Sequence, residues 1–264
     1  MINFEGKNCY GINDLKKIVE LLRGPGGCPW DQEQDHKSIR RNFLEETYEA
    51  VEAIDEENVE HLREELGDVL LQVAFHAQME EEAGHFDLDS VADGICKKLI
   101  YRHPHVFGDV SVSDSGEVLR NWEDLKQKEK NQKTAADSVD AVAKSLPGLW
   151  RAEKMQKKAA KAGFDWPDVS GALDKLSEEL SELKTAIAEG SNMEEELGDL
   201  LFAAVNVSRF IESDPEDALA GACDKFARRF RQVEEAAATQ GKALQNMELS
   251  EMDALWDSVK TQEA

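Results

Sequence analysis

Several short motifs occur twice in this chain, in the same order and about half a chain apart. The run LEETYE at 44–49 is matched by SEELSE at 177–182, and EELGDVL at 64–70 is matched by EELGDLL at 195–201. Three further pairs are Trp30 with Trp166, Lys98/Arg102 with Lys225/Arg229, and Trp122/Lys126 with Trp256/Lys260. The offsets stay between 127 and 136 residues, which indicates a tandem duplication.

Apolar residues recur at i, i+3 and i+4 through most of the chain, and the alternation typical of strands is almost absent. Only 6 Pro and 17 Gly interrupt the 264 residues. We therefore predict an all-α protein, with helices over residues 12–22, 36–54, 59–83, 88–102, 115–130, 149–162, 170–188, 193–213, 215–239 and 250–260. The polar stretch 131–140 lacks this periodicity, so we predict a linker there between two homologous helical domains, 1–130 and 141–264.

The chain is strongly acidic, with a formal net charge of −24. Because a protein that binds nucleic acid needs a basic face, this charge argues against a nucleic-acid polymer as partner. The longest apolar stretches, such as 200–205, are far shorter than a membrane span, and no apolar leader is visible at the start. The four cysteines show no metal-binding or disulfide spacing, so we expect a cytoplasmic protein without a membrane partner.

In each half, one predicted helix carries an E-E-x-x-E motif and the next carries E-x-x-D. Residues three apart lie on one face of a helix, and the short turn between the helices makes them antiparallel neighbours. Isolated E-E-x-x-E runs are expected by composition on solvated helices, but here both copies are coupled to E-x-x-D beside apolar runs. Four carboxylates in each half are therefore expected to converge, and such oxygen ligands favour Mg²⁺, or Mn²⁺. The two sets are Glu179, Glu182, Glu196 and Asp199, and Glu46, Glu49, Glu65 and Asp68.

Basic and aromatic residues in the second half complete a possible nucleotide site. Lys225 and Arg229 lie one turn apart on a predicted helix, with Arg228 beside them, and Trp256 and Trp166 are candidate platforms for a base. Each Trp taken singly is more often a core residue. No P-loop or Rossmann glycine pattern occurs in the chain.

These motifs together resemble the MazG family of nucleoside triphosphate pyrophosphohydrolases, in the all-α NTP pyrophosphatase superfamily, over essentially the whole chain. The segments that carry the resemblance are 27–31 (GCPWD), 44–49, 64–68, 102–107 (RHPHVF), 145–147 (SLP), 163–166 (GFDW), 195–199 and 225–230 (KFARRF). The resemblance implies a four-helix-bundle unit in each domain, a homodimer, Mg²⁺ dependence, and hydrolysis of NTPs or dNTPs to NMP and pyrophosphate.

The resemblance also implies roles for individual residues. The metal ligands would be Glu179, Glu182, Glu196 and Asp199. The substrate-binding residues would be Lys175, Glu179, Glu195, Asp199, Lys225, Arg228, Arg229, Trp256 and Lys260. Lys225 and Arg229 would stabilise charge on the leaving pyrophosphate, and we assign Glu178 to orient or deprotonate the attacking water.

Two other interpretations come from different functional classes. A ferritin-like di-iron bundle also gathers carboxylates from antiparallel helices, but it requires Glu-x-x-His on two helices, and only Glu82 with His85 has this spacing. A non-catalytic module that binds nucleotides for regulation is the remaining alternative. Four carboxylates in both halves argue against it, and a turnover assay separates it from an enzyme.

The two halves differ around their carboxylates. Pro104 should end the helix that carries Arg102, whereas the equivalent helix continues past Phe230. Tyr101 stands where the second half has Arg228, and the basic approach to Trp166 has no counterpart before Trp30. We therefore expect catalysis in the second half, and a contribution to assembly or regulation from the first, whose four carboxylates would form a second, inactive site.

Overall fold

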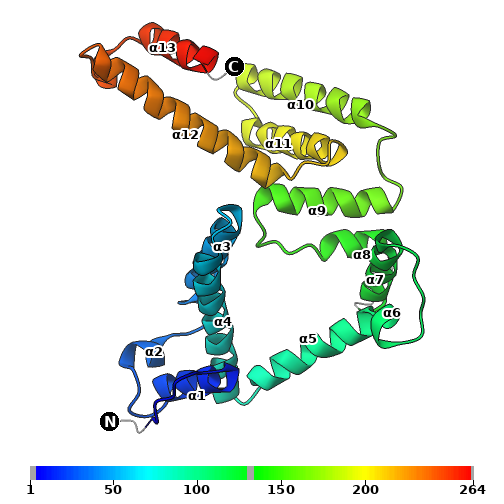
Figure 1. Ribbon diagram of the computed structural model, residues 1–264. Coiled ribbons are helices and arrows are strands. Elements are labelled where there is room, and N and C mark those ends of the chain that lie inside the picture. Colours follow the sequence, from blue (N-terminus) through cyan, green and yellow to red (C-terminus); the bar gives the residue numbers. More distant parts are fainter. Residues whose placement is uncertain (1–3, 130–133, 263–264) are drawn as a thin grey trace. The chain divides into compact units, whose positions relative to one another are not determined.

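The computed structural model describes residues 4–129 and 134–262, and the chain divides into two compact units, Met1–Lys126 and Gln127–Ala264 (Figure 1). The helices that begin in the first unit are α1 (Ile12–Arg23), α2 (Pro29–Glu33), α3 (Arg40–Asp55), α4 (Val59–Glu82), α5 (Leu88–Arg102), α6 (Pro104–Phe107) and α7 (Ser115–Glu129). The second unit contains α8 (Ala135–Asp140), α9 (Gly148–Lys161), α10 (Val169–Glu189), α11 (Met193–Phe210), α12 (Pro215–Thr239), a 3₁₀ turn η1 (Leu244–Asn246) and α13 (Leu249–Gln262).

Each unit is built around a helical hairpin, α3–α4 in the first and α10–α11 in the second. The turn of the second hairpin has Gly190 and Asn192 in the left-handed region, with φ of 69° and 52°. Glycine carries no Cβ and asparagine tolerates this region, so the sequence permits a sharp reversal here. In the first hairpin, the Asn58 side chain accepts a hydrogen bond from the His61 amide and caps α4.

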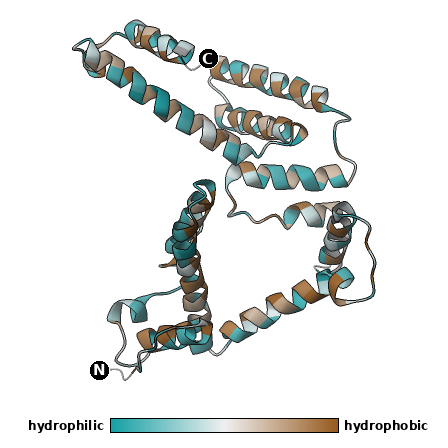
Figure 2. Ribbon diagram, viewed as in Figure 1, coloured by the Kyte–Doolittle hydropathy of each residue, from teal (hydrophilic) through white to brown (hydrophobic). Residues whose placement is uncertain are grey.

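A helix that precedes each hairpin in the sequence packs against the second helix of that hairpin, α1 against α4 and α9 against α11. In the first unit this contact is a hydrophobic core in which Val19 and Ile39 meet Phe75 and Met79. Figure 2 shows how apolar and polar residues alternate around most helices. This pattern lets one face of a helix be buried while the other meets water.

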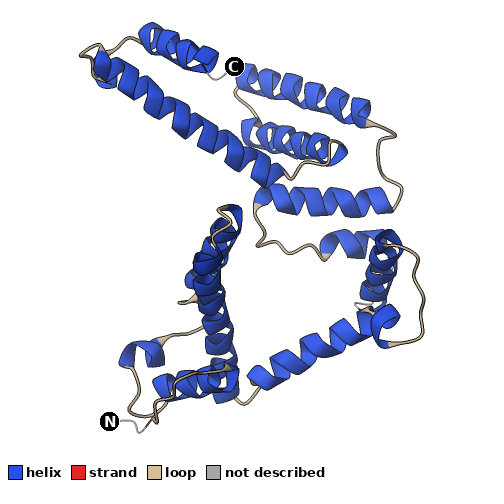
Figure 3. Cartoon of the chain, viewed as in Figure 1, coloured by secondary structure: helices blue, strands red, loops and turns tan. Residues whose placement is uncertain are grey.

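The all-α prediction is confirmed, because the described residues contain helices and no strand (Figure 3). The ten predicted helices are all present, with ends that shift by at most four residues. The largest shift is at the start of α3, where the Asp35 carboxylate accepts hydrogen bonds from the amides of Lys37 and Ser38. That local turn competes with the helix and delays its first residue to Arg40.

The region predicted as a linker, 131–140, differs from expectation where it is described. Positions 130–133 lie outside the described residues, but Ala135–Asp140 form α8, which starts at a capping box made by Thr134 and Asp137. Ser138 is buried and accepts a hydrogen bond from Lys158 of α9. This segment therefore packs as part of the second unit. A helix of six residues is too short to show an apolar period, which is why the polar stretch was predicted as a linker.

None of the helices described here combines the length and the apolar character that crossing a bilayer requires. The four cysteines, Cys9, Cys28, Cys96 and Cys223, are free thiols.

Candidate active site

Three carboxylates of the second unit converge on the α10–α11 hairpin. Glu179 projects from α10, and Glu196 and Asp199 project from α11, with one oxygen of each within 4.8 Å of the others. We call these three residues the second carboxylate cluster. Glu179 is buried, and ionised carboxylates this close repel one another unless a cation balances them. The antiparallel hairpin thus brings together residues separated by about 20 positions in the sequence, as the motif spacing predicted.

Glu182, the fourth predicted ligand, lies one turn beyond Glu179 on the same helix. A hydrogen bond to Glu179, together with burial and the negative charge of Glu179, raises the pKa of Glu182 above its ordinary value. Glu182 and Glu196 also line a recess of about 250 Å³ at the turn of the hairpin. Glu182 therefore borders the second carboxylate cluster, and its role as a metal ligand stays a prediction.

Lys175 supplies a positive charge to this cluster from within the chain. Its Nζ lies 2.7 Å from Oε1 of Glu179 and 3.0 Å from Oε1 of Glu178. These two hydrogen bonds raise the pKa of Lys175. Lys175, which was predicted to bind substrate, is therefore paired with carboxylates, and Glu178, the residue assigned to the water, is paired with Lys175.

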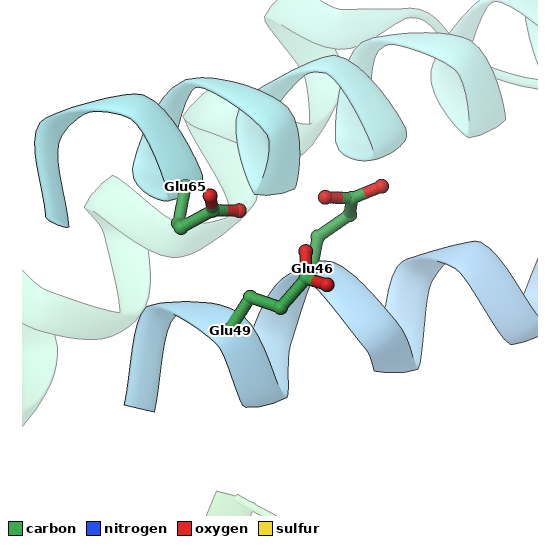
Figure 4. A group of neighbouring side chains, drawn as sticks. All are labelled: Glu46, Glu49 and Glu65. Carbon is green, nitrogen blue, oxygen red and sulfur yellow. The ribbon is translucent and has the colours of Figure 1, made fainter. Parts of the chain in front are cut away.

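The first unit also gathers three carboxylates on its α3–α4 hairpin, but two come from its first helix and one from its second, the reverse of the second unit. Figure 4 shows Glu46 and Glu49 on α3 and Glu65 on α4, and oxygens of the three lie within 4.8 Å of one another. Burial, followed by repulsion from Asp68 and Glu49, raises the pKa of Glu46. The nearest basic residue here is His61 on α4, whose Nε2 lies 3.1 Å from Oε1 of Glu65. Both units thus gather acidic residues on a hairpin, but they differ in the basic residue nearby.

Most of the other predicted residues lie on a separate pair of helices, α12 and α13. Lys225, Arg228 and Arg229 belong to α12, and Trp256 and Lys260 belong to α13, which packs against α12. The Trp256 ring contacts that of Phe226 at a centroid distance of 5.4 Å. Lys260 lies 3.4 Å from Asp257. Glu195 is exposed in the first turn of α11. The substrate roles of this set stay predictions.

The donor set of the second carboxylate cluster fits a hard divalent cation. It offers carboxylate oxygens, without the thiolate or imidazole ligands that favour zinc or copper. The three carboxylates carry more negative charge than the single ammonium of Lys175 that pairs with Glu179 can balance. A cation would remove that excess.

Sequence reasoning named Lys175 as a substrate-binding residue but missed its pairing with Glu179, and it missed the pairing of His61 with Glu65. The pairs Lys175–Glu179 and His61–Glu65 both have the i, i+4 spacing of neighbours on a helix, so both contacts could have been predicted from the sequence. The spacing did not distinguish these two pairs, because it also occurs in many surface pairs of a chain with this many charged residues.

The raised pKa values predict a pH dependence of metal binding. Glu46, Glu65 and Glu182 have pKa values above their ordinary 4.5 in the folded protein, so the folded state binds more protons than the unfolded chain just above that pH. Without metal, these groups therefore lower the free energy of unfolding as pH rises through that interval. Because metal binds the ionised form, the increase in Tm caused by Mg²⁺ should grow over the same interval.

The measurement is Tm with Mg²⁺ minus Tm with EDTA, from about pH 4 to about pH 8. Taking this difference cancels the titration of distant groups such as Asp87, whose pKa is lowered by hydrogen bonds to Ser90 and Lys16. An increment that stays flat or shrinks with rising pH contradicts metal binding at the carboxylates.

The sequence of this chain matches a known protein family. The MazG nucleotide pyrophosphohydrolase domain matches residues 34–107 and 169–234, one segment in each unit. A nucleoside triphosphate pyrophosphohydrolase of Escherichia coli K12 is 45% identical over 96% of this chain and 98% of its own length. The Thermotoga maritima nucleoside triphosphate pyrophosphohydrolase/pyrophosphatase MazG is 44% identical over 94% of this chain and 95% of its own. YabN of Bacillus subtilis, named as uncharacterized, is 51% identical over 96% of this chain and 52% of its own length. With matches in both units and relatives that align over nearly its full length, this chain belongs to the MazG nucleotide pyrophosphohydrolase family.

Proposed function

We propose that this protein hydrolyses nucleoside triphosphates, with ribose or deoxyribose, to the monophosphate and pyrophosphate. The observation that carries the proposal is the second carboxylate cluster, three converging acidic side chains in a chain of the MazG family. The names of the Escherichia coli and Thermotoga maritima relatives support the same reaction.

The second carboxylate cluster and Glu182 would hold Mg²⁺, or Mn²⁺, between α10 and α11. When bound, the cation supplies charge neutralisation and a more acidic water molecule. Glu178 is exposed one residue before Glu179, where it could accept a proton from the attacking water. Water adds to phosphorus, the anhydride bond breaks, and its electron pair leaves with pyrophosphate. Lys225 and Arg229 would stabilise the charge that develops there.

We assign the reaction to the second unit. Here α12 continues without a break to Thr239 and carries Arg228 and Arg229, whereas α5 of the first unit ends at Arg102, just before Pro104. A basic residue also contacts the cluster on α10, where the equivalent position of α3 is Asn42. The first unit would contribute to assembly or regulation.

A homodimer would cover apolar surface that one chain leaves exposed. Leu173, Leu180 and Ile187 form a stripe at seven-residue spacing along α10, and each is 43–59% exposed. Phe226 and Phe230 add a second apolar strip on α12. Continuous apolar stripes of this length are typical of helix interfaces. A second copy is the proposed occupant, as in the dimer that the resemblance implies.

Replacing Leu180 with Glu should therefore dissociate the dimer, because a charge would be buried without a partner. The molar mass from size-exclusion chromatography with light scattering checks this. Ala188→Glu adds the same charge at an exposed site outside the stripe and should leave the mass unchanged. A monomeric wild type, or a dimeric Leu180→Glu variant, contradicts the interface.

Product identity tests the proposed function. Purified full-length protein is incubated with a panel of NTPs and dNTPs and Mg²⁺, and the products are followed by phosphorus NMR. We expect NMP and pyrophosphate to appear together from the first time point. NDP with orthophosphate would refute the reaction, and tight binding without turnover would favour the regulatory module.

A further inference from the structure

Three histidines of the first unit meet one glutamate beside the connection between α2 and α3. His36 lies in that connection, His76 and Glu80 lie on α4, and His85 lies in the turn that follows α4. The Nδ1 atoms of His36 and His76 are 2.7 Å apart, and the two rings are nearly parallel, at 4°. We call these four residues the histidine cluster. None of them is a predicted metal ligand or substrate-binding residue.

The hydrogen bonds around His36 indicate where its proton lies. Its Nε2 is 2.7 Å from Oε1 of Glu80, and the other oxygen of Glu80 is 2.6 Å from Nδ1 of His85. Glu80 is ionised near neutral pH, because the hydrogen bonds from His85 and His36 lower its pKa. A carboxylate only accepts, so Nε2 of His36 carries the proton. The bare Nδ1 of a neutral His36 then accepts a hydrogen bond from Nδ1–H of His76.

The contact between His36 and His76 holds one proton between its two Nδ1 atoms. A first added proton leaves the bond intact, because an imidazolium on either side can donate to the neutral ring opposite. A second added proton puts a hydrogen on both Nδ1 atoms, so two N–H groups of like charge would face each other across 2.7 Å. Double protonation is therefore incompatible with this contact.

The surroundings of His76 also disfavour its charged form. Burial, followed by the charge of His36, lowers the pKa of His76. On α3 the ring of Phe43 lies against His76 at a centroid distance of 5.6 Å. Charged groups of the neighbouring elements bond elsewhere: Lys16 of α1 to Asp87 and Asp89, Arg23 of α1 to Glu82, and Asp35 to the amides of Lys37 and Ser38. In the described part of the chain, Glu80 is the one carboxylate that bonds to these imidazoles.

The contact ties a particular segment to α4. Residues 34–39 join α2 to α3, and their two ends are anchored. Arg23 Nη1 donates a hydrogen bond of 3.1 Å to the backbone oxygen of Gln34, and Ile39, which is 4% exposed, packs in the core with Phe75. Between these anchors, the exposed His36 reaches α4 through its side chain. Loss of that contact would free the middle of the segment and leave the core in place.

The second unit does not repeat the histidine cluster. With the offset of 131 residues that relates the two E-x-x-D motifs, His76 corresponds to Val207 and Glu80 to Ile211. Neither side chain titrates. The cluster is therefore a property of the first unit, to which we assign assembly or regulation, and the second unit serves as an internal control.

We propose that His36 and His76 form a pH-dependent latch, which holds the α2–α3 connection on α4 at neutral pH and releases it when both imidazoles are protonated. Histidine suits this role because its ordinary pKa lies between pH 5 and 8. The pKa of His76 is lower in the folded protein than its ordinary 6.5. The folded state thus binds fewer protons than the unfolded chain just below that pH, and its free energy of unfolding falls as the pH falls there.

The test replaces His76 with Asn, whose amide can still bond to His36 but takes up no proton. Tm of the full-length protein in EDTA is measured at about pH 7.5 and about pH 5.5. We expect the wild type to lose about 3 °C more than His76→Asn on acidification. His105→Asn, on α6 outside the cluster, should keep the wild-type loss. Equal losses in the wild type and His76→Asn overturn the proposal.

NMR of the full chain with ¹⁵N-labelled histidine follows the ring nitrogens directly. We expect the pair to titrate in two steps, with the second proton bound at least about tenfold more weakly than the first. If His76→Asn fails to fold, His36→Asn removes the other half of the pair, and His76 should then titrate in one step. Independent one-step titrations of both residues in the wild type refute the latch.

Amide hydrogen exchange measures the release itself. After correction for the intrinsic effect of pH, peptides that cover residues 34–39 should exchange faster at about pH 5.5 than at about pH 7.5 in the wild type. In His76→Asn they should not. The turn between α10 and α11 should show no such change in either protein. Unchanged exchange of 34–39 in the wild type would show that the segment stays in place and would overturn the proposal.

Discussion

Replacing Glu179 with Gln is expected to lower kcat/KM for NTP hydrolysis by at least about a hundredfold, because it removes the buried negative charge of the second carboxylate cluster. The amide keeps the size of the side chain, so the helical fold should survive. Stability without metal should rise or stay level, since one of three repelling charges is lost. Initial rates of pyrophosphate release, together with circular dichroism, measure both effects.

The first unit offers a matched control for this variant. Glu46 occupies the equivalent position on α3 and also belongs to a cluster of three carboxylates whose oxygens lie within 4.8 Å of one another. Glu46→Gln removes the same charge from the same kind of hairpin, and we expect nearly wild-type turnover. An inactive Glu46→Gln beside an active Glu179→Gln would move the reaction to the first unit. Activity lost in both variants would make the two clusters interdependent.

Much of this fold could be predicted because its helices are long and amphipathic. A helix such as α10 shows its 3.6-residue period over 21 residues, so its existence and its ends can be predicted from sequence alone. The short elements could not. The five residues of α2 and the four of α6 are too few to show a period, and each begins at a proline that reads equally well as a turn. The capping box of α8 was a visible signal within a polar stretch.

The convergence of the carboxylates was predictable for a related reason. Residues three apart share a helix face, and a short turn leaves two helices little choice but to pack side by side. The contact between Gln156 and Phe202 joins residues 46 positions apart, and no local pattern indicates it. Sequence reasoning therefore predicted the convergence of the acidic residues and missed this contact, which depends on how α9 packs against α11.

Removing divalent metal should have the largest effect of all, with turnover lost by at least about a hundredfold in EDTA. The chain carries a net charge of −24, and the second carboxylate cluster brings three acidic side chains together, so a triphosphate would meet net repulsion there. Refilling with Mg²⁺ or Mn²⁺ should restore the rate, because both accept oxygen ligands.

The fold should persist when the metal is removed and returned, since the Lys175 ammonium already pairs with Glu179 when no metal is present. Lys175→Met removes that pair and should lower Tm in EDTA more than in Mg²⁺, because the cation then takes over its balancing role. Lys184 is an exposed lysine on the same helix, and Lys184→Met should leave Tm unchanged both in EDTA and in Mg²⁺. Undiminished turnover in EDTA would show that the carboxylates act without metal. An equal loss of Tm with and without Mg²⁺ in Lys175→Met would mean that the cation binds elsewhere.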